Sequence, residues 1–181
     1  MIVDRAKATC LVAALAAASP AQAITHFFCW QGGGGYSMTG QFSYPDALAG
    51  QPIIRETDVT QFEIIGYFEG DYVGSWDLTR LNDDTSWLLR YDQRSGTFPL
   101  KGGSGLYQMW NANGFVNDCG SLGFGFNAGN GGQDVCIDGT YIATSTIDWD
   151  TPIVTQGEAP NPTCAGPLIL GRLGTSAGGR G

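Results

Sequence analysis

The chain has 181 residues, of which 43% are hydrophobic and 12% aromatic, so it can bury a sizeable core in spite of its 28 glycines. This length fits a single domain. The formal net charge of −8 argues against nucleic acid and anionic membrane surfaces as partners.

The start of the chain has the three parts of a secretory signal peptide. Two cations precede an uncharged apolar run at residues 8–18, and Ala21-Gln22-Ala23 supplies the small residues that a signal peptidase reads. The apolar run is much shorter than the roughly 20 residues that span a bilayer. We therefore expect residues 1–23 to be removed, no membrane span to remain, and the mature protein to be secreted, periplasmic or at the cell surface.

The cysteines indicate an oxidising compartment. Cys10 lies inside the predicted signal, so the mature chain keeps Cys29, Cys119, Cys136 and Cys164. An even number in an exported chain predicts two disulfides, for which three pairings are open. Cys119 and Cys136 flank a glycine-rich segment resembling two strands and a turn, which favours their pairing and leaves Cys29 with Cys164. Without a Cys-x-x-Cys pair, and with His26 as the only histidine, we expect no zinc site.

Short alternating runs separated by turn residues predict β-strands along the mature chain. In chain order these strands are expected at 36–44, 62–68, 72–78, 87–91, 97–100, 122–126 and 134–144. Turn residues at 69–71 and 92–96 predict two hairpins. Gly40 interrupts the apolar face of the first run, where we expect a bulge. Helical spacing is limited to single turns near 46–49 and 56–59.

This pattern predicts an all-β fold. We expect an antiparallel β-sandwich of jelly-roll-like type, or a flattened barrel, over residues 24–150. Prolines and glycines then predict an extended, poorly regular tail over 151–181, with disorder over 171–181.

Several segments share a pattern of strands and turns with known exported proteins. They lie at 36–44, 59–65, 74–78, 85–87, 95–98, 108–111 and 139–145. Together they resemble an uncharacterised all-β module of bacterial exported proteins, many of which carry PEP-CTERM-type sorting tails. The resemblance implies an all-β secreted or surface protein, and it supplies no catalytic or ligand residues. A sorting tail is not evident in this sequence, because the apolar stretch 167–170 is short.

The sequence favours a non-enzymatic protein. A serine or cysteine nucleophile needs a base, and His26, the only histidine, lies just after the predicted cleavage site. A glycosidase needs only a pair of carboxyl groups, which an acidic chain can supply. A small secreted hydrolase of that kind therefore stays as the alternative function.

Three stretches are candidates for calcium, at 82–84, 129–134 and 148–150, because they cluster the oxygen ligands that hard cations prefer. The stretch 129–134 partly matches a calcium-binding repeat, but that repeat works in tandem copies and occurs once here. A hairpin loop explains the same glycines. We expect no cofactor, with calcium as the alternative.

Aromatic residues point to sugar binding as a candidate function. Flat rings stack on sugars, and amides hydrogen-bond to hydroxyl groups. Trp110 has Gln108 and Asn111 beside it in a glycine-rich segment, whereas Trp76 and Trp87 lie in strand-like runs and are expected in the core or on a sheet face. We therefore predict a polysaccharide or extracellular-matrix ligand, contacted by Trp110, Gln108 and Asn111.

The predicted signal has a direct test. Cleavage after Ala23 gives a mature protein that begins at Ile24. Mass spectrometry of the exported protein measures this terminus, and secreted material that retains residues 1–23 would contradict the prediction.

Overall fold

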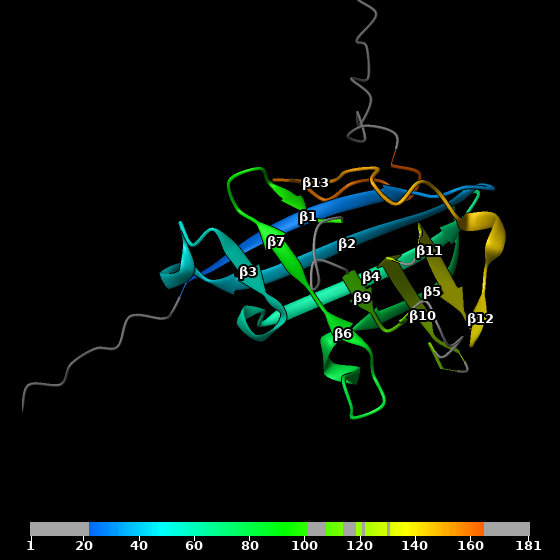
Figure 1. Cartoon of the computed structure of the whole chain (residues 1–181), viewed down its shortest axis with the longest axis horizontal. Coiled ribbons are helices and arrows are strands. Elements are labelled where there is room, and N and C mark those ends of the chain that lie inside the picture. Colours follow the sequence, from blue (N-terminus) through cyan, green and yellow to red (C-terminus); the bar gives the residue numbers. More distant parts are fainter. Residues whose placement is uncertain (1–21, 101–107, 114–118, 121, 130, 165–181) are drawn as a thin grey trace, which may run out of the picture.

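The computed structural model describes residues 22–100, 108–113, 119–120, 122–129 and 131–164 (Figure 1). These residues form two sheets. In spatial order, the eight-stranded sheet contains β3 (Ile53–Arg55), β7 (Arg90–Asp92), β8 (Thr97–Phe98), β13 (Ile153–Gln156), β1 (Ala23–Gln31), β2 (Tyr36–Pro45), β4 (Gln61–Phe68) and β5 (Asp71–Asp77). The five-stranded sheet contains β12 (Thr140–Tyr141), β11 (Gly132–Ile137), β10 (Phe124–Gly129), β9 (Gln108–Trp110) and β6 (Trp87–Leu88).

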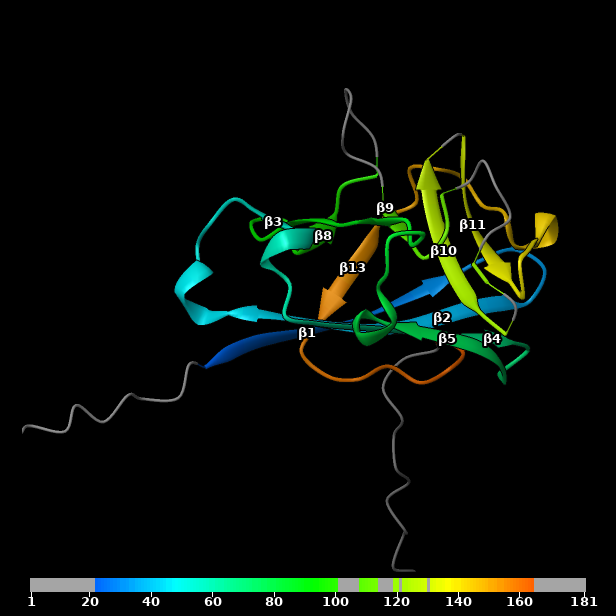
Figure 2. The ribbon, with the colours of Figure 1, turned by 90° about the horizontal axis from the view of Figure 1, so that it is seen from below.

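The eight-stranded sheet curls around the core, and the five-stranded sheet faces its long strands. In Figure 2, β1, β2, β4 and β5 form one layer, and β9, β10 and β11 lie on the other side. Every strand pairing is antiparallel. The predicted all-β sandwich or flattened barrel is therefore confirmed.

The remaining regular structure consists of single turns of 3-10 helix. They are η1 (Asp46–Leu48), η2 (Glu56–Asp58), η3 (Leu78–Arg80) and η4 (Ala143–Ser145). The first two lie where helical turns were expected. In the part of the chain that the structure describes, no helix has the length and apolar character needed to cross a membrane.

Alternate side chains of the long strands point inward and form the core. Phe28 of β1, Phe42 of β2 and Ile64 of β4 all point inward and are fully buried. Gly40 lies between them, paired with Phe28 on one side and Ile64 on the other. The bulge expected at Gly40 is wrong, because the pairing continues without a shift. A Cβ at this position would lie 2.1 Å from the Phe28 ring, so the glycine makes room for that ring.

The expected strand at 87–91 is divided between the sheets. β6 pairs with β9 in the five-stranded sheet, whereas β7 pairs with β3 and β8 in the other. Leu89 lies between them and is fully buried. The predicted hairpin survives as the β7–β8 pairing, while the first residues of the expected strand belong to the other sheet.

The domain continues past the expected boundary at residue 150. β13 pairs with both β1 and β8, so residues 153–156 belong to the eight-stranded sheet and not to an irregular tail. At the other end, Ala23 pairs with Pro45, and the predicted cleavage would leave the rest of β1 in place. Residues 1–21 and 171–181 lie outside the described residues.

Both predicted disulfides are present. Cys29 is bonded to Cys164 with a Cα–Cα distance of 5.6 Å, and Cys119 is bonded to Cys136 with 5.9 Å. The first bridge joins β1 to the chain beyond β13, across a sequence separation of 135 residues. It therefore fastens both ends of the domain to the same sheet.

Candidate functional site

The predicted ligand residue Trp110 lies in the centre of the core. Its side chain is 0% exposed. Its ring lies between both layers, with centroid distances of 5.3 Å to Phe28, 5.1 Å to Phe62, 5.2 Å to Phe98 and 4.8 Å to Phe126. A ring without exposed surface offers no face to a sugar, so the expectation that Trp110 contacts a ligand does not hold.

Gln108 is also fully buried, and its amide joins two strands. The Nε2 atom donates to the carbonyl oxygens of Arg90 (2.9 Å) and Pro99 (2.8 Å), and Oε1 accepts from the Arg90 N–H (3.0 Å). These bonds connect β9 to the backbone of β7 where no strand pairing does so. Gln108 therefore has a structural role, and its polar atoms are directed away from solvent.

Asn111 fastens the chain next to the second disulfide. Its Nδ2 donates to the carbonyl oxygens of Cys119 (3.0 Å) and Phe124 (2.9 Å). Gly125 of β10 permits this close approach, since a Cβ at this position would lie 2.4 Å from the Asn111 carbonyl oxygen. The sequence placed Trp110 and Asn111 outside the deep core because their segment is rich in glycine, whereas the structure packs the backbone of Asn111 tightly against β10.

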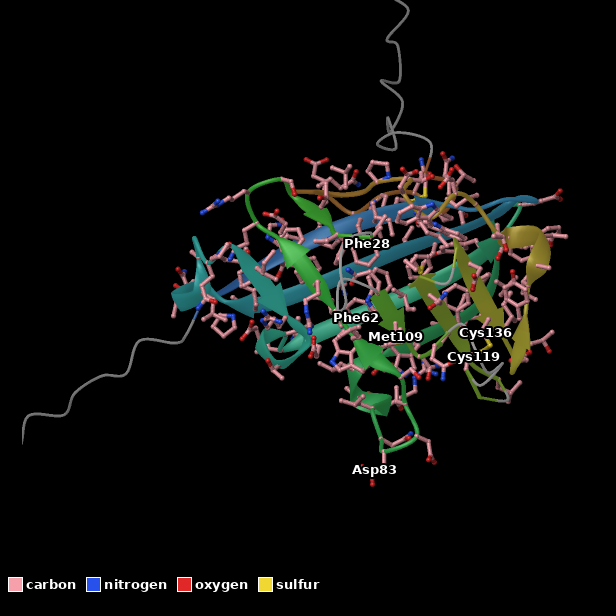
Figure 3. All side chains as sticks on the ribbon, in the orientation of Figure 1. Phe28, Phe62, Asp83, Met109, Cys119 and Cys136 are labelled. Atoms are coloured by element: carbon pink, nitrogen blue, oxygen red, sulfur yellow. A yellow bond between two sulfur atoms is a disulfide. The ribbon has the colours of Figure 1, made fainter. Side chains whose placement is uncertain are left out.

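The two tryptophans that were expected in strands lie in or at the edge of the core. Trp76 is buried, Trp87 is half-buried, and both rings contact Phe62, at 5.9 Å and 4.8 Å between centroids. Figure 3 shows Asp83 at the tip of an exposed loop, well away from Phe28 and Phe62.

His26 is surrounded by aromatic side chains. Its ring contacts those of Phe42, Tyr44 and Tyr91 at 5.3, 5.7 and 5.0 Å. The imidazole Nε2 lies 3.1 Å from the Tyr44 hydroxyl, which donates to the Oε1 of Gln93 at 3.1 Å. Burial lowers the pKa of His26, so its neutral form is favoured. These contacts suit an edge of the core, and the hydroxyl group beside the imidazole belongs to a tyrosine and not to a serine.

The acidic stretches considered for calcium form local turns. The Asp84 N–H donates to Asn82 Oδ1 (2.9 Å), and the Asp150 N–H donates to Asp148 Oδ1 (3.3 Å). Among the described residues, no group of three or more His, Cys, Asp or Glu side chains is arranged to hold a metal ion.

A different site lies on the outer face of the eight-stranded sheet. A shallow groove of about 150 Å³, here called the outer-face groove, is lined by Phe27, Thr39, Gly40, Gln41, Glu63, Ile65 and Ala159. The register explains its floor: Phe27, Gln41 and Glu63 are direct cross-strand neighbours on β1, β2 and β4. They point outward because the residues beside them in sequence point into the core.

The wall of this groove is the segment after β13, residues 157–164, here called the strap. In Figure 2 it runs along the side of β1, β2 and β4 that faces away from the core. The Cys29–Cys164 disulfide anchors its end, the Ser37 hydroxyl donates to the Pro162 oxygen (2.6 Å), and Gln31 Nε2 donates to the Thr163 oxygen (3.1 Å). Ser37 faces outward yet is only 6% exposed.

The groove combines apolar and polar groups. Phe27 and Ile65 supply apolar surface, and Gln41 Nε2 donates to Glu63 Oε2 at 3.0 Å. Farther along the same face, Tyr72 is 65% exposed, and its hydroxyl lies 3.2 Å from the hydroxyl of Ser75. Small-molecule sites have this composition, with hydrophobic walls and a few placed hydrogen-bonding groups.

A second carboxyl group lies next to the groove. Asp77 of β5 is the cross-strand neighbour of Glu63. The Thr79 side chain holds the pKa of Asp77 below its ordinary value, with further help from the Thr79 N–H and Arg80. Asp77 therefore favours its ionised form and is unsuited to donate a proton as a general acid.

Sequence reasoning missed this site for a specific reason. The alternation that places Phe42 and Ile64 inside also places Gln41 and Glu63 outside, so the floor could have been derived. The position of the strap could not be derived from the sequence, because its course depends on the pairing of β13 and on the Cys29–Cys164 bridge.

Comparisons with known proteins give no relative. No protein-family model matches the chain, and no curated protein or solved structure is significantly similar to it.

The buried position of Trp110 has a direct consequence for stability. Trp110→Ala removes a ring that contacts both layers, so we expect the free energy of unfolding to fall by roughly 3–5 kcal/mol. Urea unfolding of the two proteins measures the difference. A loss below about 1 kcal/mol would contradict the central packing role of this ring.

Asp134 makes stability depend on pH. It lies half-buried on β11 opposite Asn127, and burial raises its pKa from 3.8 to about 6, against the opposing effect of the Asn127 side chain. The folded state therefore holds this proton more tightly than the unfolded chain does. The stability it contributes is full below about pH 4 and is lost as the pH rises through about 6.

In Asp134→Asn we expect this loss of stability between about pH 4 and pH 6 to disappear. Urea unfolding at a series of pH values measures it, with Asp138→Asn, at an exposed position of the following turn, as the matched control. The same pH dependence in wild type and Asp134→Asn would show that burial of Asp134 is not its cause.

Proposed function

We propose that the protein is an exported, non-enzymatic β-sandwich domain that binds a polysaccharide chain in the outer-face groove. The observation that carries this proposal is the Gln41–Glu63 pair between the apolar surfaces of Phe27 and Ile65, with Ala159 of the strap as the wall. An amide and a carboxylate can hydrogen-bond to neighbouring sugar hydroxyls, while apolar side chains contact the ring face.

The exposed tyrosine farther along the sheet extends this surface. Ile65 of the groove is paired with Ser75, whose hydroxyl contacts that of Tyr72. A chain of sugar units lying across β4 and β5 can therefore reach a 65% exposed aromatic side chain beyond the groove. The groove and this exposed ring together offer a sugar polymer contacts at more than one unit.

Export is supported by the cysteines. Two disulfides tie the domain together, and disulfides persist in oxidising compartments outside the cytosol. Together with the predicted signal at residues 1–23, they support a secreted, periplasmic or cell-surface location. We also propose that the chain is related to the uncharacterised all-β module of bacterial exported proteins that its segments resemble.

A glycosidase-like hydrolase is the second candidate function, because Glu63 and Asp77 face the same side of the sheet. The contacts of Asp77 with Thr79 and Arg80 favour the binding role, since they keep this carboxyl group ionised. Release of reducing sugar by the wild-type protein, abolished in Glu63→Gln, would favour the hydrolase.

The binding role is tested with a glycan array, followed by titration of the soluble polysaccharides that it selects. Gln41→Ala removes an amide from the groove, and we expect affinity to fall by at least about tenfold with an unchanged melting temperature. Gln51→Ala, at an exposed position outside the groove, is the matched control and should bind as wild type does. Equal binding by Gln41→Ala and wild type would contradict this site.

A further inference from the structure

We propose that the outer-face groove selects polysaccharides that carry protonated amino groups, with Glu63 as the carboxylate that pairs with the amine. This inference rests on the proposed function and names the class of sugar that the site prefers. It follows from the distribution of charge on the groove, the strap and the neighbouring strand.

The groove and the hollow beside it are acidic. Glu63 lines the groove. On the strap, Ala159 also lines a neighbouring hollow, together with Glu158. Neither set of lining residues includes a lysine, arginine or histidine. With a chain net charge of −8, this surface repels uronate-bearing or sulfated polysaccharides.

Glu63 differs from the acidic side chain next to it. Arg80 forms an ion pair with Asp77 at 3.2 Å and also donates to the carbonyl oxygen of Ser75. The other ion pair of the described residues joins Arg90 to Glu56. Glu63 receives a hydrogen bond from the neutral amide of Gln41, and neither of these ion pairs includes it.

The absence of Glu63 from both ion pairs of the described residues matters when a sugar chain covers it. A sugar chain that covers the half-buried Glu63 removes more water from its carboxylate, which is unfavourable unless a cation compensates the charge. A neutral sugar offers hydroxyl groups alone, whereas a protonated amine adds a charge-assisted hydrogen bond. Phe27 and Ile65 stay available to the apolar face of the sugar ring in either case.

The test compares oligosaccharides of equal length by isothermal titration at low salt and about pH 6, where sugar amines carry charge. The probes are a β-1,4-linked glucosamine oligomer, its fully N-acetylated counterpart and a galacturonic acid oligomer. We expect the glucosamine oligomer to bind at least about tenfold more tightly than the acetylated one, and the uronate to bind most weakly. Added salt should reduce the preference.

The matched variants are Glu63→Gln and Asp83→Asn. Glu63→Gln keeps the shape and removes the charge, so the preference for the amine should fall to about one while the acetylated oligomer still binds. Asp83 lies at the tip of an exposed loop far from Phe28 and Phe62 (Figure 3), and Asp83→Asn should keep the wild-type preference.

The outcomes separate the two proposals. Equal wild-type affinity for the amine and acetylated oligomers, or an unchanged preference in Glu63→Gln, overturns the amine selectivity and leaves polysaccharide binding standing. Absence of binding to all three oligomers and to the glycan array overturns the proposed function itself.

Discussion

The packing of aromatic rings between the two sheets sets the geometry of the whole domain. Trp110 of the five-stranded sheet contacts Phe28 and Phe62 of the opposite sheet, together with Phe98 of β8. Large rings in one close-packed layer determine how far apart the sheets lie and which face of each strand turns inward. Gly40 shows how strict this packing is, because the Phe28 ring occupies the space that a Cβ would need.

The residues on the outer face of the eight-stranded sheet are determined by those that point into the core. Since β1, β2 and β4 commit alternate residues to the aromatic core, the intervening residues Phe27, Gln41 and Glu63 form a row on the opposite side. On its own, such a row is an ordinary polar sheet surface. The strap turns part of it into a groove, and the Cys29–Cys164 bridge fastens the strap to β1.

Buried polar groups connect the parts that strand pairing leaves separate. The Gln108 amide joins β9 to β7, and Asn111 fastens the backbone near the Cys119–Cys136 bridge. On β11, Gln133 Oε1 accepts from the Trp30 indole N–H at 2.9 Å, and Gln133 Nε2 donates to the Thr151 oxygen at 2.7 Å. Each amide donates to a backbone carbonyl oxygen of a segment that strand pairing does not connect to its own.

The sequence by itself determined the all-β class and the inward positions of β2 and β4, and it favoured the cysteine pairing that the structure contains. Alternation and cysteine spacing are local signals that survive in any compact arrangement. Only the tertiary structure decided that Trp110, Gln108 and Asn111 lie inside, because burial depends on which residues from distant segments cover a side chain. It also decided the groove, since β13 joins the sheet and the Cys29–Cys164 bridge, across a sequence separation of 135 residues, holds the strap against β1.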